Sequence, residues 1–248
     1  MPGAHEAYCS LAGEYDRLLG DLAGSTWRSG ILAELARLRR PGRGGVVVDL
    51  GAGTGIGGRL IRQAGWGYRL VGIDRSARML KSAAGYDARI VADMTVPPAG
   101  ASSADFMVAG FDTLNYLSPA RMRRCLASAA RGLKPGGWMI FDYSSPELLR
   151  RRWRDYRYDQ PLRDGLLRWR NRYDATAARC VSDIRRYDAQ GNLAWRETHI
   201  QYALDTYPLH QAALAAGLHT ERVRDLERPE FSPSASTHVW VLRKETAG

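Results

Sequence analysis

Hydrophobic and polar positions divide the first 143 residues into regularly alternating strands and helices. Short apolar runs predict buried strands at 46–50, 69–74, 88–92, 105–110 and 138–143. Helical segments fall between these runs, including one that starts at about Pro119. Strands that alternate with helices over ordinary connection lengths predict an α/β fold built on a parallel sheet.

The pattern changes after Ser144 and returns to alternation only near Asp205. Between them, we expect a helix near 146–154, strands near 166–173, 180–187 and 193–202, and a hairpin loop at 188–192. A helix at about 209–216, ended by Gly217, and strands near 218–226 and 237–243 complete the chain. We therefore expect one domain over 1–248, with a helical cap at 1–40 and an antiparallel insert at 144–205.

The first strand and the glycines that follow it predict a cofactor site. Val46–Leu50 leads directly into Gly51, Gly53 and Gly55. Glycines let the backbone approach a ligand closely, and the next helix points its free N–H groups at that ligand. A dinucleotide-binding turn needs its third glycine at position 56, where this chain has Ile56. The spacing therefore favours a cofactor other than a dinucleotide.

Carboxylates follow the next two strands. Asp74 ends the second strand about twenty residues after the glycines, where such folds bind ribose hydroxyls. Ser76 can cap the helix that follows, so that role does not require Asp74. Asp93 follows the third strand. The position of Asp74 therefore predicts a ligand that contains ribose.

Three segments resemble class I S-adenosylmethionine-dependent methyltransferases. The Asp-x-Gly-x-Gly-x-Gly run at 49–55 is similar to motif I of that family. The loop 111–117 resembles the segment after strand four of its small-molecule members, and 133–137 resembles their Leu-Lys-Pro-Gly-Gly. The resemblance implies a Rossmann-like seven-stranded sheet whose last two strands form an antiparallel hairpin. It also implies that the antiparallel insert forms an acceptor lid.

The resemblance implies an enzyme that transfers a methyl group from S-adenosyl-L-methionine to oxygen or nitrogen of a small metabolite, in natural-product metabolism. Its N-terminal helix, which begins near Tyr15, would lie over the cofactor, and Asp93 would accept from the adenine amino group. The cofactor-binding residues that the resemblance implies are Tyr15, Asp49, Gly51, Ala52, Gly53, Gly55, Asp74, Arg75, Met79, Asp93, Met94, Gly110 and Phe111.

The acceptor should lie at the carboxyl ends of the strands, between the loop 111–117, the N-terminal helix and the insert. His199 is a candidate general base because the pKa of histidine lies near working pH, and Tyr116 is a comparable candidate. Trp27, Trp153 and Trp195 are further aromatic candidates for the pocket wall. The expected substrate-binding residues are Tyr8, Asp112, Asn115, Tyr116, Tyr143 and Trp169.

Composition adds two alternative interpretations. The net charge of +10 and the arginine-rich segment 150–157 are compatible with an RNA (tRNA) methyltransferase. Only three of the 36 basic residues are lysines, which suggests a compositional bias more than a phosphate track. A methyltransferase-fold cyclase or a non-catalytic cofactor-binding protein is the other alternative, because a fold does not fix chemistry.

The remaining expectations concern location and partners. No apolar run reaches membrane-spanning length, and the first residues contain neither a basic nor an apolar stretch typical of a secretion signal. Cys9, Cys125 and Cys180 form no metal-ligand spacing, so no metal is expected. We expect a cytoplasmic monomer or homodimer whose partner is a small-molecule acceptor, and neither a membrane nor a nucleic acid.

Overall fold

The computed structural model describes residues 8–39, 44–96 and 100–246. Seven strands form a central sheet in the order β10-β11-β5-β4-β1-β2-β3, and β11 runs antiparallel to both its neighbours. The other pairs are parallel, which confirms the predicted sheet and its final hairpin. The strands are β1 (Val46–Leu50), β2 (Arg69–Asp74), β3 (Ala88–Val91), β4 (Ala104–Ala109), β5 (Leu133–Ser144), β10 (Leu218–Asp225) and β11 (Thr237–Lys244).

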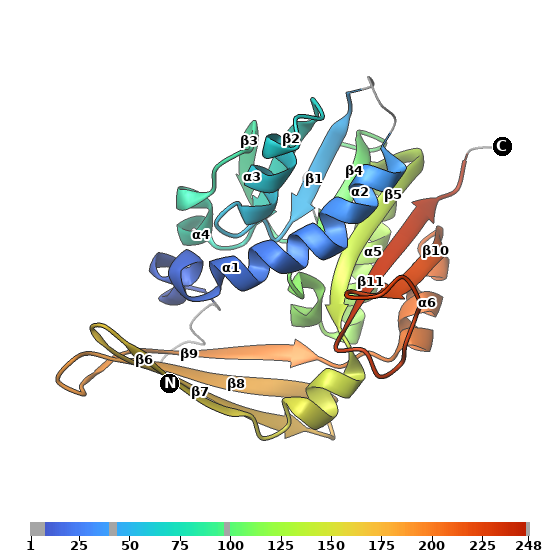
Figure 1. Ribbon diagram of the computed structural model, residues 1–248. Coiled ribbons are helices and arrows are strands. Elements are labelled where there is room, and N and C mark those ends of the chain that lie inside the picture. Colours follow the sequence, from blue (N-terminus) through green and yellow to red (C-terminus); the bar gives the residue numbers. More distant parts are fainter. Residues whose placement is uncertain (1–7, 40–43, 97–99, 247–248) are drawn as a thin grey trace.

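Helices cover both faces of this sheet (Figure 1). On the N-terminal side, α1, the π-helical turn η2 and α2 run without a break, and α3 packs beside them on the same face. The opposite face is covered by α5 and α6. The helical elements are η1 (Leu11–Gly13), α1 (Tyr15–Trp27), η2 (Arg28–Leu32), α2 (Ala33–Leu38), α3 (Ile56–Gln63), α4 (Ala77–Ser82), η3 (Thr113–Tyr116), α5 (Pro119–Gly132), η4 (Leu148–Arg152) and α6 (Thr206–Ala215).

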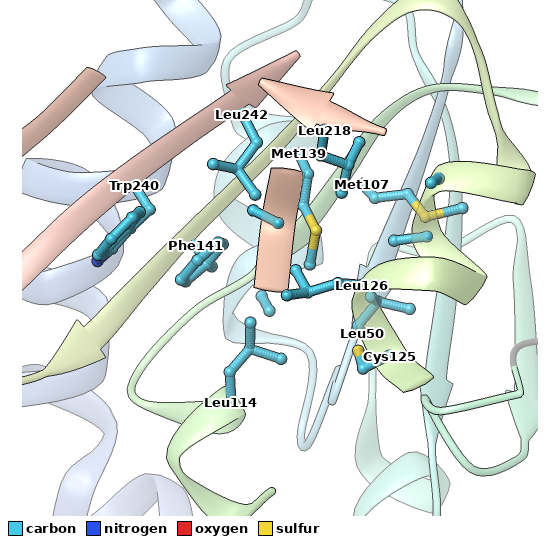
Figure 2. Packing of buried hydrophobic residues seen from close by; sticks show 14 of the residues in the cluster. Leu50, Met107, Leu114, Cys125, Leu126, Met139, Phe141, Leu218, Trp240 and Leu242 are labelled. Atoms are coloured by element: carbon cyan, nitrogen blue, oxygen red, sulfur yellow. The ribbon is translucent and has the colours of Figure 1, made fainter. Parts of the chain in front are cut away.

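Alternate residues of each strand enter the two cores. In β4, Phe106 and Val108 face α1–α3, whereas Met107 and Ala109 face α5 and α6. Both sets are almost fully buried, because a parallel sheet covered on two faces has no solvent side. Figure 2 shows the α5 and α6 side, where the labelled residues are Leu50, Met107, Leu114, Cys125, Leu126, Met139, Phe141, Leu218, Trp240 and Leu242.

A second, antiparallel sheet lies across the carboxyl ends of the large one (Figure 1). Its strands are β6 (Arg157–Leu162), β7 (Gly165–Asp174), β8 (Arg179–Tyr187) and β9 (Leu193–Tyr202), in that order. The sequence pattern missed β6, an edge strand whose Arg-Tyr-Asp-Gln-Pro-Leu carries no apolar alternation. Proline is tolerated on such an edge. The helix predicted at 146–154 is present over residues 146–152, and its last five residues form the π-helical η4.

The buried positions of β8 and β9 are largely polar. Ser182 and Arg186 are buried on β8, and Glu197, His199 and Gln201 are buried on β9. This inverts the usual pattern of an antiparallel sheet, whose covered face is apolar. Buried polar groups need hydrogen-bond partners. The face therefore has the composition of a lined site rather than of a hydrophobic core.

No helix within the described ranges is long and apolar enough to cross a membrane.

A buried ion pair fastens the N-terminal helices to the sheet. Arg224 on β10 donates from Nε to the Glu34 carboxylate at 2.6 Å, and from its terminal nitrogens to the carbonyl oxygens of Ser29 and Asp225. Glu34 is only 3% exposed. Burial raises the pKa of Glu34, but the bonds from Arg224 and Arg37 outweigh it and lower that pKa below its ordinary value.

We predict that Arg224→Leu lowers the free energy of unfolding by about 3 kcal/mol, because it leaves a buried carboxylate without its main partner. Urea unfolding at neutral pH measures the change. A lowered folded pKa stabilises the protein above the unfolded pKa, and the stabilisation is lost as pH falls through the folded value. The difference between wild type and variant should therefore shrink in acid.

Arg37→Leu is the control, because Arg37 binds the same carboxylate but is 47% exposed on its side chain. We expect a cost below about 1 kcal/mol. If Arg37→Leu and Arg224→Leu lower the free energy of unfolding equally, burial does not decide how strongly each arginine binds Glu34.

Candidate functional site

A pocket opens at the carboxyl ends of β1, β2 and β4, where α1 and Tyr8 cover it. It encloses a cavity of about 160 Å³ and widens toward solvent, and its lining combines aromatic and apolar residues with a few polar groups, as small-molecule sites do. This is the position where open parallel sheets bind ligands. The pocket is lined by Tyr8, Tyr15, Ala23, Trp27, Gly51, Ala52, Gly53, Thr54, Ile56, Gly57, Asp74, Arg75, Ser76, Met79, Met94, Gly110, Phe111, Thr113 and Tyr116.

The glycine-rich turn forms the floor of the pocket. Gly51 and Gly53 have φ angles of +78° and +54°, which glycine adopts at little cost. The N–H of Gly53 donates to Asp74 at 2.8 Å, so the turn is fixed to the end of β2. A backbone free of side chains thus faces the open space.

Asp74 presents a carboxylate beside this turn. Its other oxygen accepts from the N–H of Ser76 at 2.8 Å, and the Ser76 hydroxyl caps α4 by accepting from Met79, as predicted. Burial raises the pKa of Asp74, although backbone N–H bonds act in the opposite direction. A carboxylate has about four lone-pair positions, so it can accept further bonds from a ligand.

The indole of Trp27, near the end of α1, closes the side of the pocket. Gly57 on α3 and Gly110 after β4 both pack against this ring, and a Cβ on either would lie 2.4 Å from it. Any larger residue would force the indole to move. The two glycines therefore allow α1, α3 and the loop after β4 to meet at one point.

Most of the cofactor-binding residues expected from the sequence line this pocket; Asp49, Gly55 and Asp93 do not. Asp49 lies behind the turn, where it accepts from the Tyr86 hydroxyl, and burial raises its pKa to about 7. Gly55 caps α3 and packs against the backbone of Ala84.

Asp93 is engaged elsewhere. Arg121 donates to its carboxylate at 2.8 Å, and the N–H of Thr95 donates at 2.9 Å. These bonds lower the pKa of Asp93 although burial acts to raise it. An adenine amino group that donates to Asp93 would therefore bind a carboxylate that is already paired with Arg121.

The lining also contains residues that the sequence analysis did not assign to the cofactor. Trp27 was expected only as an aromatic wall. The sequence feature that could have assigned Trp27 to the cofactor pocket is its place at the end of the N-terminal helix. The others are small or flank the recognised motifs, and no pattern distinguished them: Ala23, Thr54, Ile56, Gly57, Ser76 and Thr113.

Two tyrosines connect the pocket to the buried polar face of the insert. The hydroxyls of Tyr8 and Tyr116 lie 2.6 Å apart, and the Tyr116 hydroxyl lies 2.9 Å from His199 Nδ1. His199 Nε2 lies 3.0 Å from the Glu197 carboxylate. Both candidate catalytic residues therefore belong to one hydrogen-bonded chain, of which only the tyrosines line the pocket.

Glu197 also holds the segment before α1. Its two oxygens accept from the N–H groups of Tyr8 at 3.0 Å and Leu11 at 2.9 Å, and also from that of Ser10. Burial raises the pKa of Glu197, but these bonds and that from His199 outweigh it and lower the pKa below its ordinary value. Glu197 is consequently an ionised carboxylate.

The loop after β4 has an unusual backbone conformation. Phe111 and Asp112 have φ angles of +54° and +52°, which are uncommon for residues with side chains. The Asp142 carboxylate accepts from both of their N–H groups, at 2.7 Å for Phe111, and so offsets the strain. Burial raises the pKa of Asp142 to about 6.

Asp112 was expected to bind substrate, but it lies outside the pocket lining. It accepts from the Ser144 hydroxyl at 3.3 Å and from the Gln201 side chain. Burial, together with the nearby Asp142, raises its pKa to about 7. Asp112 therefore forms part of the polar layer behind the pocket.

Three other expected substrate-binding residues use their polar atoms to join the insert to the large sheet or to brace it. Asn115 donates to the carbonyl oxygens of Ser144 and Tyr202, at 3.0 and 3.1 Å. Tyr143 donates to that of Tyr202 at 2.8 Å. Trp169 donates to Asn171 at 2.7 Å, and its ring centroid lies 6.4 Å from that of His199.

Within the described ranges, no group of three or more histidine, cysteine or acidic side chains is arranged to hold a metal ion.

Comparisons with known proteins give a consistent picture. A family model described as a methyltransferase domain matches residues 47–137. A search of curated protein sequences found no match. The structure is similar to an S-adenosylmethionine-dependent methyltransferase from Clostridium acetobutylicum, with 18% identity, a TM-score of 0.79, and coverage of 96% of this chain and 99% of the other.

Two other similar structures are of named methyltransferases. The CcbJ methyltransferase of Streptomyces caelestis is 21% identical, with a TM-score of 0.78 and 96% of each chain covered. CalS10 of Micromonospora echinaspora, an amino pentose methyltransferase involved in calicheamicin biosynthesis and solved with S-adenosylmethionine bound, is 19% identical, with a TM-score of 0.67 and coverage of 91% of this chain and 95% of the other. These likenesses establish the fold.

The match to a methyltransferase domain over residues 47–137, the order of the seven strands and the pocket at their carboxyl ends show that the chain has the fold of S-adenosylmethionine-dependent methyltransferases.

Proposed function

We propose that this enzyme methylates an oxygen or nitrogen of a small metabolite in natural-product metabolism. The observation that carries the proposal is the cover over the pocket, where Tyr8 and Tyr116 line the space and are backed by the polar face of the insert. A covered pocket suits a small acceptor more than a polymer. The similarity to CalS10, an amino pentose methyltransferase, supports the same class of acceptor.

The residues present fit S-adenosylmethionine. The left-handed glycines give a bare backbone cradle, and Asp74 offers acceptor positions to ribose hydroxyls. When bound, the cofactor supplies an electrophilic methyl group on a sulfonium. The protein must then hold the acceptor in line at about 3 Å and exclude water.

We propose that residues 144–205 act as the acceptor lid and that the cap at 1–40 closes the cofactor side, in one functional unit. The described part of the cap contacts the insert through Glu14, which accepts from Trp195 at 3.2 Å and pairs with Arg186. Because the cap and the insert meet over the pocket, the acceptor would be enclosed between them.

The arrangement of arginines supports a small acceptor over RNA. On the insert, Asp159 pairs with Arg168 and Arg170, and Asp183 pairs with Arg185 and Arg196. Paired guanidinium groups attract phosphates less than free ones, because the neighbouring carboxylates repel them. These two carboxylates therefore compensate part of the positive charge on the strands of the insert.

We predict that the protein binds S-adenosylhomocysteine and that Asp74→Ala weakens this binding by about 1–3 kcal/mol, because a charged acceptor of hydroxyl hydrogen bonds is removed. Titration calorimetry measures both. Asp21→Ala, which changes an exposed acid of α1, serves as the control and should not alter the affinity. Binding of a nicotinamide dinucleotide in place of S-adenosylhomocysteine would contradict the proposal.

Trp169→Ala tests the role of the insert. Since Trp169 lies outside the cofactor pocket and near His199, the variant should keep its S-adenosylhomocysteine affinity while methyl transfer to a metabolite extract falls. Labelled cofactor and mass spectrometry follow the product. Transfer at the wild-type rate would place the acceptor against the N-terminal helix and Tyr116 instead.

A third prediction concerns RNA. Neutralised phosphates release counterions, so a tRNA methyltransferase should bind its substrate with a steep dependence on salt. We expect no sequence-selective binding of tRNA in fluorescence anisotropy at physiological salt. A tight, salt-sensitive and selective complex would favour the RNA alternative.

A further inference from the structure

We propose that Tyr8, Tyr116 and His199 form a proton relay from the acceptor to a buried base, and that Glu197 is the positioning residue that sets its direction. The inference rests on the proposed function, because it assigns the route by which the acceptor loses its proton. His199 is thereby the base, although it does not line the pocket, and Tyr8 is the end of the relay that faces the acceptor.

The direction of the relay follows from the donors and acceptors. Ionised Glu197 only accepts, so the nitrogen of His199 that faces it, Nε2, carries the hydrogen. Neutral His199 then has a lone pair on Nδ1, which accepts from the Tyr116 hydroxyl. Tyr116 has used its hydrogen and accepts from Tyr8. Lone pairs of Tyr8 are left to accept from a donor in the pocket.

Each member of the relay passes on one proton. As the acceptor loses a proton to the Tyr8 oxygen, Tyr8 passes its own proton to Tyr116, and Tyr116 passes its own to His199 Nδ1. One O–H or N–H bond of the acceptor breaks and one N–H bond forms on His199, while both tyrosines end neutral. The acceptor's lone pair forms its new bond to the methyl carbon as the carbon–sulfur bond breaks. His199 returns its proton to water on product release.

Neither tyrosine suits the role of base. Burial raises the pKa of both Tyr8 and Tyr116 well above that of a free phenol, and neighbouring acidic groups raise both further. A stable tyrosinate is therefore disfavoured at the pocket. The proton must pass through the phenols to a group that can carry charge, and the histidine paired with a carboxylate is that group.

The surroundings of His199 support a transient positive charge. Tyr8 and Tyr116 face it from the N-terminal segment and η3, Trp169 faces it from β7, and Glu197 lies beside it on β9. Asp112 is a further acid near both tyrosines, and Asp74 is another near Tyr8. No cation faces His199 among the contacts of the described residues, so the imidazolium would be balanced by Glu197 as in a catalytic triad.

Glu197 also makes the relay depend on closure of the site. The same carboxylate that orients His199 binds the N–H groups of Tyr8 and Leu11. Tyr8, the first member of the relay, is therefore brought to Tyr116 by the residue that positions its last member. The base would be connected to the acceptor only while the N-terminal segment covers the pocket.

Glu197→Gln is the central test, because it keeps the shape but adds a donor. The introduced side-chain amide can donate to Nε2, which moves the hydrogen of His199 to Nδ1 and reverses every bond of the relay. We expect nitrogen NMR to show the Nε2–H form in wild type and the Nδ1–H form in Glu197→Gln, with His199→Gln used to assign the signal. The Nδ1–H form in wild type would overturn the inferred direction.

Kinetics give the second readout. Glu197→Gln and Tyr116→Phe should each lower kcat by about a hundredfold or more with S-adenosylhomocysteine affinity retained. The double change Tyr116→Phe with His199→Gln should cost little more than either alone, because one chain is broken only once.

Glu14→Gln is the matched control. Glu14 also ties the N-terminal segment to the insert but does not contact His199. It should change KM for the acceptor while the tautomer of His199 and kcat stay close to those of wild type. If Glu14→Gln reproduces every effect of Glu197→Gln, Glu197 merely docks the segment and the relay is wrong.

These outcomes separate the relay from the proposed function. If wild type methylates an acceptor but Tyr116→Phe and Glu197→Gln turn over at the wild-type rate, the relay fails and the function stands. If wild type methylates no metabolite, the proposed function fails, and the relay as a route for the acceptor's proton fails with it. Should Glu197→Gln not fold, Tyr116→Phe still decides the kinetic part, because it removes one oxygen and leaves the ring.

Discussion

The contact of the Trp27 indole with two glycines is the constraint on which the pocket depends. Gly57 belongs to the helix after the glycine-rich turn, and Gly110 follows β4. Because neither has a side chain, a large aromatic ring at the end of α1 can lie directly on both. The N-terminal helix is thereby held against the carboxyl edge of the sheet, where it forms one wall of the pocket.

A second organising feature is the polar layer between the two sheets. Glu197, Asp142 and Asn115 are buried there and Asp112 is half-buried, and each has a hydrogen-bond partner on another segment of the chain. Buried polar groups are costly when unpaired and specific when paired. The insert is therefore held in one position relative to the pocket by directional bonds, whereas an apolar interface would tolerate sliding.

The layer also explains why several expected substrate residues lie outside the pocket. Tyr143 and Asn115 both bind the carbonyl oxygen of Tyr202, so their polar atoms hold the last insert strand against β5 and η3. In the sequence, a polar or aromatic residue in or near the loop after β4 suggests a contact with a ligand. Such residues can equally support the loop, and only the partner of each polar atom distinguishes the two roles.

The sequence by itself determined the fold and the location of the cofactor turn. Apolar runs, glycine spacing and the cap at Ser76 act over a few residues, so they can be recognised without knowing what packs where. Prediction failed where the local pattern is weak. The edge strand β6 was missed because its residues show no alternation of apolar and polar side chains. Asp93 followed its strand as expected, but its pairing with Arg121 depended on a helix 28 residues away.

Only the tertiary structure decided which side chains act together. Tyr8 and Tyr116 are 108 residues apart, and Tyr116 and His199 are 83 apart. No periodicity connects positions at such distances, because the contact depends on how the insert and the N-terminal segment dock on the sheet. His199 and Tyr116 could be named separately from the sequence as candidate bases, but their joining through one hydrogen bond, with Glu197 behind, required the folded arrangement.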